Sequence, residues 1–176
     1  LFMAKIGLFY ATDTGNTRKI AKRIKKQFEE GEIELFDVAK ATPDAMKDCE
    51  ALIVGTPTLG DGELPDTLAA FLEQMDSSHV SGKTIAMFGL GDQVGYPTEF
   101  VDALGITYKK LKKLGANLIG GWSAEGYEFE KSKALRDGEF VGLVLDQDNQ
   151  ADQTNERLEE WLEQVKPELL GATVTG

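Results

Sequence analysis

Residues 6–17 read IGLFYATDTGNT, and this stretch decides how the rest of the chain is interpreted. Its first part, residues 6–10, is a short apolar run of the kind that forms a strand buried on both faces of a parallel sheet. A polar loop follows, and residues 17–30 then place Ile20, Ile24 and Phe28 on one helical face. Strand, polar loop and helix in this order predict the start of an alternating α/β domain.

The same alternation continues along the chain. Further β-rich apolar runs occupy residues 33–38, 51–55 and 84–89, with a fifth run in two pieces, 117–120 and 140–145. Amphipathic helical patterns cover residues 100–114 and 153–170, with shorter candidates at 65–74 and 42–49. Strands that alternate with helices predict a doubly wound α/β sheet, in which ligands bind outside the carboxyl ends of the strands.

Length and composition bound the class of protein. The 176 residues predict a single domain over 1–176, in which residues 1–3, with Leu1 and Phe2 ahead of the first methionine, are expected to be vector-derived or disordered. The 30 acidic and 19 basic residues give a net charge of −11, which argues against nucleic-acid and membrane partners and favours proteins with basic patches. The single cysteine, Cys49, excludes an internal disulfide. With no long apolar run and no leader pattern, we expect a cytoplasmic protein.

Residues 11–17, the first loop, have the composition of an anion site. Their hydroxyl and backbone N–H groups stand at the beginning of a helix, and the first cation, Arg18, comes only inside that helix. A dianionic phosphate could therefore be held by neutral donors and the helix dipole. The alternative interpretation is an ordinary N-cap turn.

Two further loops follow the third and fourth apolar runs. The second loop, residues 56–65, reads TPTLGDGELP, and the third, residues 89–97, reads GLGDQVGYP. Their glycines allow backbone conformations that other residues avoid, and Tyr96 offers a flat face for stacking an aromatic ligand. Taken singly, the second loop could be a flexible turn and Tyr96 could simply pack on the domain.

In this order the patterns TxTGNT, TPTLGDGELP and GDQVGY resemble the binding site for flavin mononucleotide (FMN) of flavodoxins. The resemblance runs from about Ala4 to about Leu169. It implies a flavodoxin-like doubly wound fold, with a five-stranded parallel sheet in three layers and one non-covalently bound FMN. Residues 121–142 split the fifth strand as the insertion of long-chain flavodoxins does, although they are expected to make no ligand contact.

The resemblance also assigns cofactor contacts. The phosphate would be surrounded by Thr12, Asp13, Thr14, Gly15, Asn16 and Thr17. The two sides of the flavin ring would be lined by Thr56, Pro57, Thr58, Leu59, Gly60 and Gly62 from the second loop, and by Gly91, Asp92, Gln93 and Tyr96 from the third. Many flavodoxins have tryptophan where Leu59 stands, so only one face of the ring would have an aromatic partner. Leucine followed by GDGE resembles flavodoxins associated with nitrogen fixation.

The function implied is that of a low-potential one-electron carrier and not an enzyme. It would cycle mainly between semiquinone and hydroquinone, and Asp61, Glu63, Asp66 and Asp92 near the ring would lower its potential. The implied partners of this monomer are flavodoxin reductase and redox enzymes such as nitrogenase, through its reductase component.

Two other functions stay open at this point. The first is an FMN-dependent NAD(P)H or quinone reductase of the same fold. The second, a phosphoacceptor signalling domain, needs an aspartate at the end of the third strand, where the chain has Val54, Gly55 and Thr56. Outside the three loops, Cys49 is expected to be a structural thiol and His79 a loop residue without a partner. No residues have metal-ligand spacing.

Overall fold

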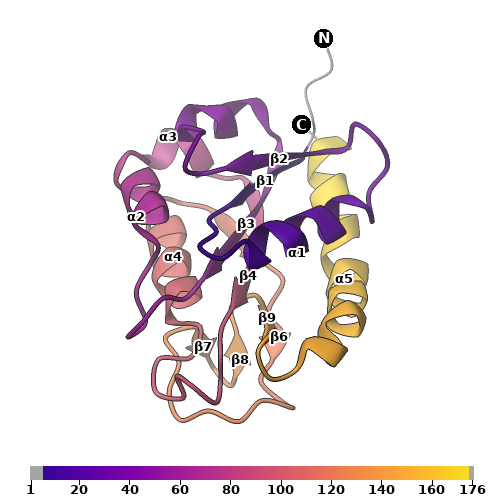
Figure 1. Ribbon diagram of the computed structural model, residues 1–176. Coiled ribbons are helices and arrows are strands. Elements are labelled where there is room, and N and C mark those ends of the chain that lie inside the picture. Colours follow the sequence, from indigo (N-terminus) through magenta and orange to yellow (C-terminus); the bar gives the residue numbers. More distant parts are fainter. Residues whose placement is uncertain (1–5, 175–176) are drawn as a thin grey trace.

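The computed structural model describes residues 6–174, so the expectations for residues 1–3 and for Ala4 lie outside the described part. Figure 1 shows a central sheet between two layers of helices. The parallel strands are ordered β2-β1-β3-β4-β5, and β9 also pairs with β4. Their bounds are β1 Ile6–Tyr10, β2 Ile33–Asp37, β3 Ala51–Pro57, β4 Thr84–Leu90, β5 Asn117–Ile119 and β9 Leu143–Leu145. The predicted doubly wound sheet is confirmed.

The helices lie on both faces of this sheet. Helices α1 and α5 share one hydrophobic core with the sheet, and α2 and α4 share the other. The helix bounds are α1 Asn16–Lys25, α2 Asp66–Glu73, α3 Ser77–Val80, α4 Asp102–Lys113 and α5 Thr154–Val174, with 3-10 helices η1 Pro43–Asp48 and η2 Ala151–Gln153. The three predicted layers are therefore present.

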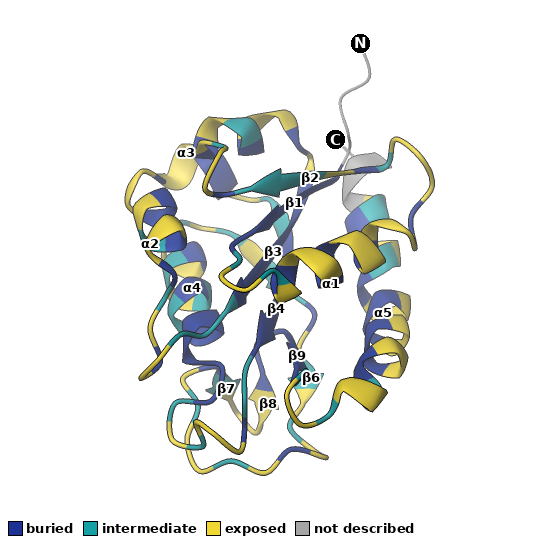
Figure 2. Ribbon diagram, in the orientation of Figure 1, coloured by how far each residue is buried: buried dark blue, intermediate teal, exposed yellow. Residues whose placement is uncertain are grey.

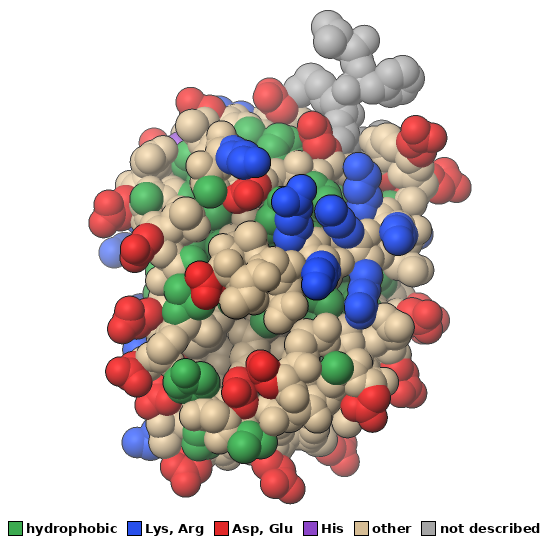
Figure 3. Space-filling model, in the orientation of Figure 1, with side chains coloured by type: hydrophobic (Ala, Val, Ile, Leu, Met, Phe, Trp, Pro, Cys, Tyr) green, Lys and Arg blue, Asp and Glu red, His purple; other side chains and the backbone are tan. Residues whose placement is uncertain are grey.

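The two cores follow from the alternation of side chains along each strand. In β1, Leu8 and Phe9 are both fully buried, and they belong to opposite cores because successive residues point to opposite faces. Figure 2 shows β1, β3 and β4 buried, the edge strand β2 largely half-buried, and the outer faces of the helices exposed. The outer face of α1 is basic, and Figure 3 shows its Lys and Arg side chains gathered on one side of the molecule.

Several predicted boundaries were wrong for local reasons. Helix α1 ends at Lys25 instead of residue 30, and the chain then turns through Gly31, whose φ is 85°. The segment 42–49 forms a 3-10 helix and not an α-helix. Helix α4 begins at Asp102 instead of residue 100, because Val101 before it has the left-handed φ of 47°.

The fifth strand is split, as the sequence predicts. Strand β5 pairs with residues 84–86 of β4, and β9 pairs with residues 88–90. The second piece is shorter than expected, because Phe140 belongs instead to a small antiparallel sheet that the sequence did not predict. Its strands are β6 Trp122–Ser123, β7 Leu135–Arg136 and β8 Glu139–Phe140, in the order β6-β8-β7.

The inserted segment packs tightly against α4. A Cβ built on Gly105 would lie 2.2 Å from the carbonyl oxygen of Lys133, so the backbone of the insertion occupies the space of a side chain. Next to this contact, the backbone N–H of Lys133 donates to the Asp102 carboxylate at 2.7 Å. The insertion is therefore part of the packed structure that supports the beginning of α4.

Replacing Gly105 with alanine should force the insertion away from α4. We expect the free energy of unfolding to fall by about 2–3 kcal/mol in chemical denaturation, the range of an overpacked core. The control is Gly171→Ala in α5, where nothing lies within 4 Å of the new Cβ. Removing a helical glycine there should leave stability unchanged or raise it by about 0.5–1 kcal/mol. Equal effects of the two substitutions would contradict the close packing at Gly105.

Candidate functional site

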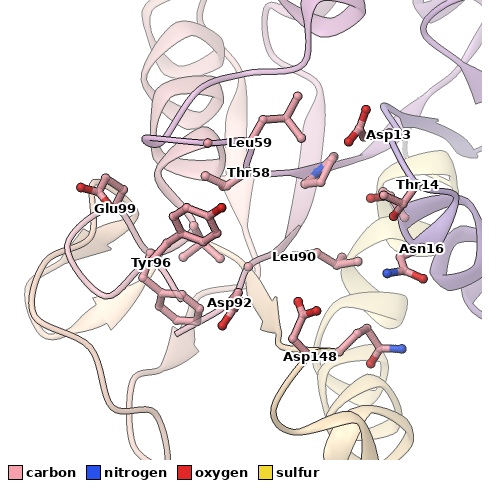
Figure 4. Close-up of a pocket in the computed structure, with 17 residues that line it drawn as sticks. Asp13, Thr14, Asn16, Thr58, Leu59, Leu90, Asp92, Tyr96, Glu99 and Asp148 are labelled. Carbon is pink, nitrogen blue, oxygen red and sulfur yellow. The ribbon is translucent and has the colours of Figure 1, made fainter. Parts of the chain in front are cut away.

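A cavity of about 460 Å³ opens at the carboxyl ends of β1, β3, β4 and β9. Parallel strands end at the same edge of a sheet, which brings loops distant in sequence together. The predicted site residues that line it are Asp13, Thr14, Asn16, Thr17, Pro57, Thr58, Leu59, Gly60, Gly91, Asp92 and Tyr96. Figure 4 shows side chains from all three predicted loops around this space.

The first loop places the beginning of α1 at the cavity. Gly15 adopts φ 96°, and its N–H donates to the Thr12 hydroxyl at 3.0 Å, which closes the turn into the helix. No side chain of the described residues caps α1 at this end. The first N–H groups of α1 are therefore available to an anionic ligand near Asn16 and Thr17, which line the cavity. Thr12 and Gly15 shape this turn without lining the cavity.

The second loop is a tight turn. Leu59 and Glu63 exchange backbone hydrogen bonds of 2.9 and 2.7 Å, and the Gly62 N–H donates to the Leu59 carbonyl at 3.0 Å. Gly60 has φ 43° and Asp61 has no positive φ, which is the pattern of a type II′ turn. Gly62, at φ 91°, packs against Asp102 instead of lining the cavity. A Cβ on Gly60 would meet no atom within 4 Å.

The two threonines of this loop have structural hydrogen bonds. The Thr58 hydroxyl accepts a hydrogen bond from the Ala103 N–H at 3.1 Å and so caps the first turn of α4. Thr58 also lines the cavity. Thr56 is fully buried, and its hydroxyl donates to the Pro57 carbonyl at 2.8 Å. The structure therefore does not bring Thr56 to the cavity.

Gln93 of the third loop also lies away from the cavity. It is buried, its side-chain amide donates to the Asp146 carboxylate at 2.7 Å, and its side-chain oxygen accepts from the Glu128 N–H at 2.7 Å. Asn149 donates to Asp146 at 2.9 Å and to Asp92 at 2.7 Å. This network joins the third loop to the insertion and to the loop after β9. Gln93 therefore positions the third loop instead of facing the cavity.

Tyr96 and Leu59 are the two larger side chains of the expected ring site. Both line the cavity, and Figure 4 shows them on different walls. Tyr96 is 43% exposed, so its ring is open to a ligand and not packed on the domain. The space between these walls suits a flat ring system with one aromatic neighbour.

Sequence reasoning missed part of the lining. These residues are Leu90, Glu99, Phe100, Val101, Gln147 and Asp148. Gln147 and Asp148 follow the second piece of the split strand, and the rule that strands end at one edge could have placed them here. The helical pattern predicts that Phe100 and Val101 belong to the helix, and only the left-handed backbone of Val101 shows that they precede it.

The cavity is acidic. Asp13, Asp92, Glu99 and Asp148 line it, and no Lys, Arg or His among residues 6–174 does so. Three of the acids expected near a ring, Asp61, Glu63 and Asp66, are not in the lining. The short-range surroundings of a ligand would therefore repel negative charge, except at the beginning of α1.

Two of these carboxylates have pKa values shifted in opposite directions. The N–H of Gly95, with help from Asn149 and the N–H of Val94, lowers the pKa of Asp92. Burial, followed by the charges of Asp92 and Asp146, raises the pKa of Asp148. Asp92 is therefore stabilised as an anion, whereas the charge on Asp148 is disfavoured.

The residues considered outside the loops are structural. His79 has partners, contrary to expectation: its Nδ1 accepts from the Asp76 N–H at 3.0 Å, and its Nε2 lies 3.0 Å from the Asp44 carboxylate. It thus caps α3 and ties that helix to η1. Cys49 is buried, and burial raises the pKa of its thiol to about 11. An inert structural thiol fits both observations.

Residues 6–174 offer neither a metal site nor a membrane-spanning helix. They contain no group of three or more His, Cys, Asp or Glu side chains placed to hold a metal ion. None of the helices in the same range combines the length and the apolar character that crossing a membrane requires. The loop cavity is therefore the site whose chemistry needs explanation.

Comparisons with known proteins agree with this geometry. Residues 8–161 match the model of the family described as flavodoxin. The flavodoxin of Picosynechococcus sp. is 48% identical over 94% of this chain and 98% of its own length. That of Klebsiella pneumoniae is 48% identical over 96% and 100%. The structure of Fusobacterium nucleatum flavodoxin bound to flavin mononucleotide superposes with a TM-score of 0.87 at 30% identity, covering 93% of this chain and 97% of that one.

The opposite pKa shifts predict opposite effects on stability. A raised pKa makes the folded state hold its proton more tightly, so ionised Asp148 destabilises the fold once the pH exceeds that value. Asp148→Asn should therefore raise the melting temperature at pH 7, and the gain should vanish below about pH 3.9, the ordinary value for Asp. Asp92→Asn is the matched control with the reverse sign. Its lowered pKa contributes stability above the unfolded value, which the substitution removes. A lower melting temperature for Asp148→Asn at pH 7 would contradict this assignment.

Proposed function

The chain belongs to the flavodoxin family, and on that premise we propose that it carries single electrons at low potential on one non-covalently bound FMN. One observation carries the proposal. The uncapped beginning of α1 and the walls formed by Leu59 and Tyr96 open into the same cavity, so a phosphate site and a ring site are joined. The phosphate end, the ring end and the acidic lining of this cavity each suit the proposed cofactor.

The phosphate end suits neutral recognition. The N–H groups at the beginning of α1 and the hydroxyls of Thr14 and Thr17 would bind the phosphate, while Thr12 and Gly15 hold the turn. Asp13 and Asn16 complete this part of the lining. Neutral N–H and hydroxyl donors can bind a phosphate without a Lys or Arg in contact with it, and the lining has this composition.

The ring end suits a flat aromatic group. Tyr96 would stack on one side and Leu59 would cover the other, with Gly60 and Gly91 allowing close approach of the backbone. The flavin supplies the redox chemistry when bound, and the protein adjusts its energetics. The chain itself binds, orients and surrounds the ring.

The acidic lining favours a low potential. Asp13, Asp92, Glu99 and Asp148 would stand around a ring whose reduced form carries negative charge. A unit charge about 8 Å away at an effective dielectric of about 20 contributes roughly 2 kcal/mol. For a one-electron couple this corresponds to about 90 mV, and repulsion lowers the potential.

A carrier is favoured over an FMN-dependent NAD(P)H or quinone reductase. The relatives bear the name flavodoxin, an electron-transfer flavoprotein, and the described cavity lining contains no His, Lys or Cys that could act on a second substrate. Steady-state turnover of NAD(P)H with a quinone would separate the two functions, since a carrier turns over only with a reductase present.

We infer the partners from charge and from the second loop. The net charge of −11 suits redox proteins with basic docking patches, such as a flavodoxin reductase. Leu59 followed by GDGE supports the reductase component of nitrogenase as an acceptor, by resemblance alone. We also propose that the protein is a single-domain monomer in the cytoplasm.

The cofactor itself is the first test. The purified or reconstituted protein should release one FMN per chain on denaturation, identified by chromatography and absorbance. The cavity of about 460 Å³ has one phosphate end and lacks a second phosphate site in its lining, so FAD should not be recovered. Recovery of FAD, or of no flavin after reconstitution, would refute the proposal.

The second test concerns Gly60. At φ 43°, a Cβ on Gly60 would meet no protein atom within 4 Å, so within the protein the cost is backbone strain, about 1–2 kcal/mol for a β-branched residue. If the reduced, protonated ring edge requires this positive-φ arrangement of the Gly60–Asp61 peptide more strongly than the oxidised ring does, the strain falls on the reduced state. Gly60→Val should then lower the potential of the first electron by about 40–90 mV. Gly60→Ala should shift it less in the same direction.

Gly60→Asn provides the control, because asparagine tolerates positive φ better than other substituents. Its potential should stay close to that of the original protein in the same redox titration. An unchanged potential in Gly60→Val would show that this peptide does not tune the ring.

A further inference from the structure

The outer face of α1 carries an unusual concentration of positive charge. Within nine consecutive positions stand six of the 19 basic residues of the chain, and residues 16–28 include no acid. We call this surface the α1 basic face, and it consists of Arg18, Lys19, Lys22, Arg23, Lys25 and Lys26. All six side chains are exposed, and Figure 3 shows the patch they form.

These charges are not neutralised by neighbours. In the part of the chain that the structure describes, no salt bridge joins any of the six to a carboxylate. Among the described residues, the side-chain hydrogen bond made from this face goes to a neutral group: Arg23 donates to the Asn155 side chain at 3.1 Å. The α1 basic face is thus a positive patch whose charges form no contact ion pair with the described carboxylates, on a chain with a net charge of −11.

The binding cavity has the opposite charge. Its lining holds Asp13, Asp92, Glu99 and Asp148 without a cation from residues 6–174. The proposed ligand carries a dianionic phosphate, so both the net charge and the cavity lining repel it during approach. The N–H groups at the beginning of α1 act only at short range, and a longer-range attraction is needed to bring the phosphate there.

The α1 basic face is placed to supply that attraction. Helix α1 begins at the cavity with Asn16, and its 10 residues extend about 15 Å at 1.5 Å per residue. The Debye length is about 30 Å at 0.01 M salt and about 8 Å at physiological ionic strength. At low salt concentration the whole face therefore attracts a phosphate at the start of α1. At physiological ionic strength only the charges nearest to the start of α1 still attract it.

None of the six side chains belongs to the cavity lining. Arg18, the first of them, lines a separate depression with Tyr10 and Asp37. The face therefore does not hold a bound phosphate by contact. Charges outside a contact surface change association rates and salt dependence more than dissociation rates.

We propose that the α1 basic face steers the phosphate of the incoming cofactor to the beginning of α1 and so sets the rate of cofactor uptake. This inference rests on the proposed FMN function. It assigns a role to α1 residues that make no contact with the bound group, and it explains how an acidic protein takes up a dianion.

The test compares two sets of four substitutions. The first changes Lys19, Lys22, Lys25 and Lys26 to glutamine, which preserves helix propensity. The matched control makes the same change at four lysines in the C-terminal part of α4, a helix on the opposite face of the sheet from α1. They are Lys109, Lys110, Lys112 and Lys113. Both variants lose four positive charges, so net charge alone affects them equally. Circular dichroism verifies that each chain folds.

The full chain, stripped of flavin, is mixed with FMN in a stopped-flow fluorimeter at about 10 mM and about 500 mM ionic strength. The α1 variant should associate about tenfold more slowly than the original chain at low salt, at the lower end of known steering effects. At high salt the difference should fall below about twofold. The dissociation rate should change by less than about twofold, and the α4 variant should slow by less than about threefold at low salt.

Riboflavin, which has the same ring and no phosphate, separates steering from damage to the site. Its association rate should be the same for the original chain and the α1 variant. Equal slowing of FMN by the α1 and α4 variants would overturn the proposal, because net charge would then explain it. Slowing of riboflavin by the α1 variant would overturn it too, because the face would then shape the site. If the original chain takes up no FMN at all, the proposed function itself fails, an outcome distinct from uptake at unchanged rates.

Discussion

The aromatic ring of Phe88 on β4 occupies the place where a side chain on Gly55 of β3 would stand. A Cβ at Gly55 would lie 2.1 Å from that ring, so the residue paired with Phe88 has to be glycine. The register fixed here determines which residues leave the sheet at its carboxyl edge: β3 continues into Pro57 and β4 into Leu90. Both residues line the cavity. A shift of register would separate the second and third loops, and with them the walls of the site.

The sequence allowed prediction of whatever depends on local pattern. The parallel strands, the long helices and the three loops follow from apolar runs, helical spacing and glycines, and residues of all three loops line one cavity. The small antiparallel sheet of β6, β7 and β8 does not follow from these patterns. The role of Gln93 could not be predicted, because its partner Asp146 lies 53 residues away and only the fold brings them within hydrogen-bond distance. His79 was missed for the same reason, since its partner Asp44 belongs to another segment. Long-range polar pairing leaves no periodic signal in the chain.

Two neighbouring surfaces at α1 carry opposite charge in this molecule. At contact distance the cavity offers four carboxylates and the uncapped N–H groups of α1. Beyond contact distance, the face of the same helix presents its lysines and arginines to solvent. A repulsive lining suits a strongly reducing ring, whereas an attractive approach suits the capture of its phosphate. The four carboxylates come from loops outside α1, whereas the basic side chains stand on α1 and directly after it, so each set can be changed without the other.

The split fifth strand has a consequence for how the protein is made. A chain leaving the ribosome presents β1 to β5 first, and the sheet then lacks the strand that pairs with residues 88–90 of β4. Asp146, which anchors the third loop, and Gln147 and Asp148, which close the cavity, are translated only after the insertion. The nascent chain therefore has the phosphate end of the site long before it has the complete ring end. Stable loading with a cofactor therefore has to wait until residues 146–148 have been translated and have folded onto the sheet.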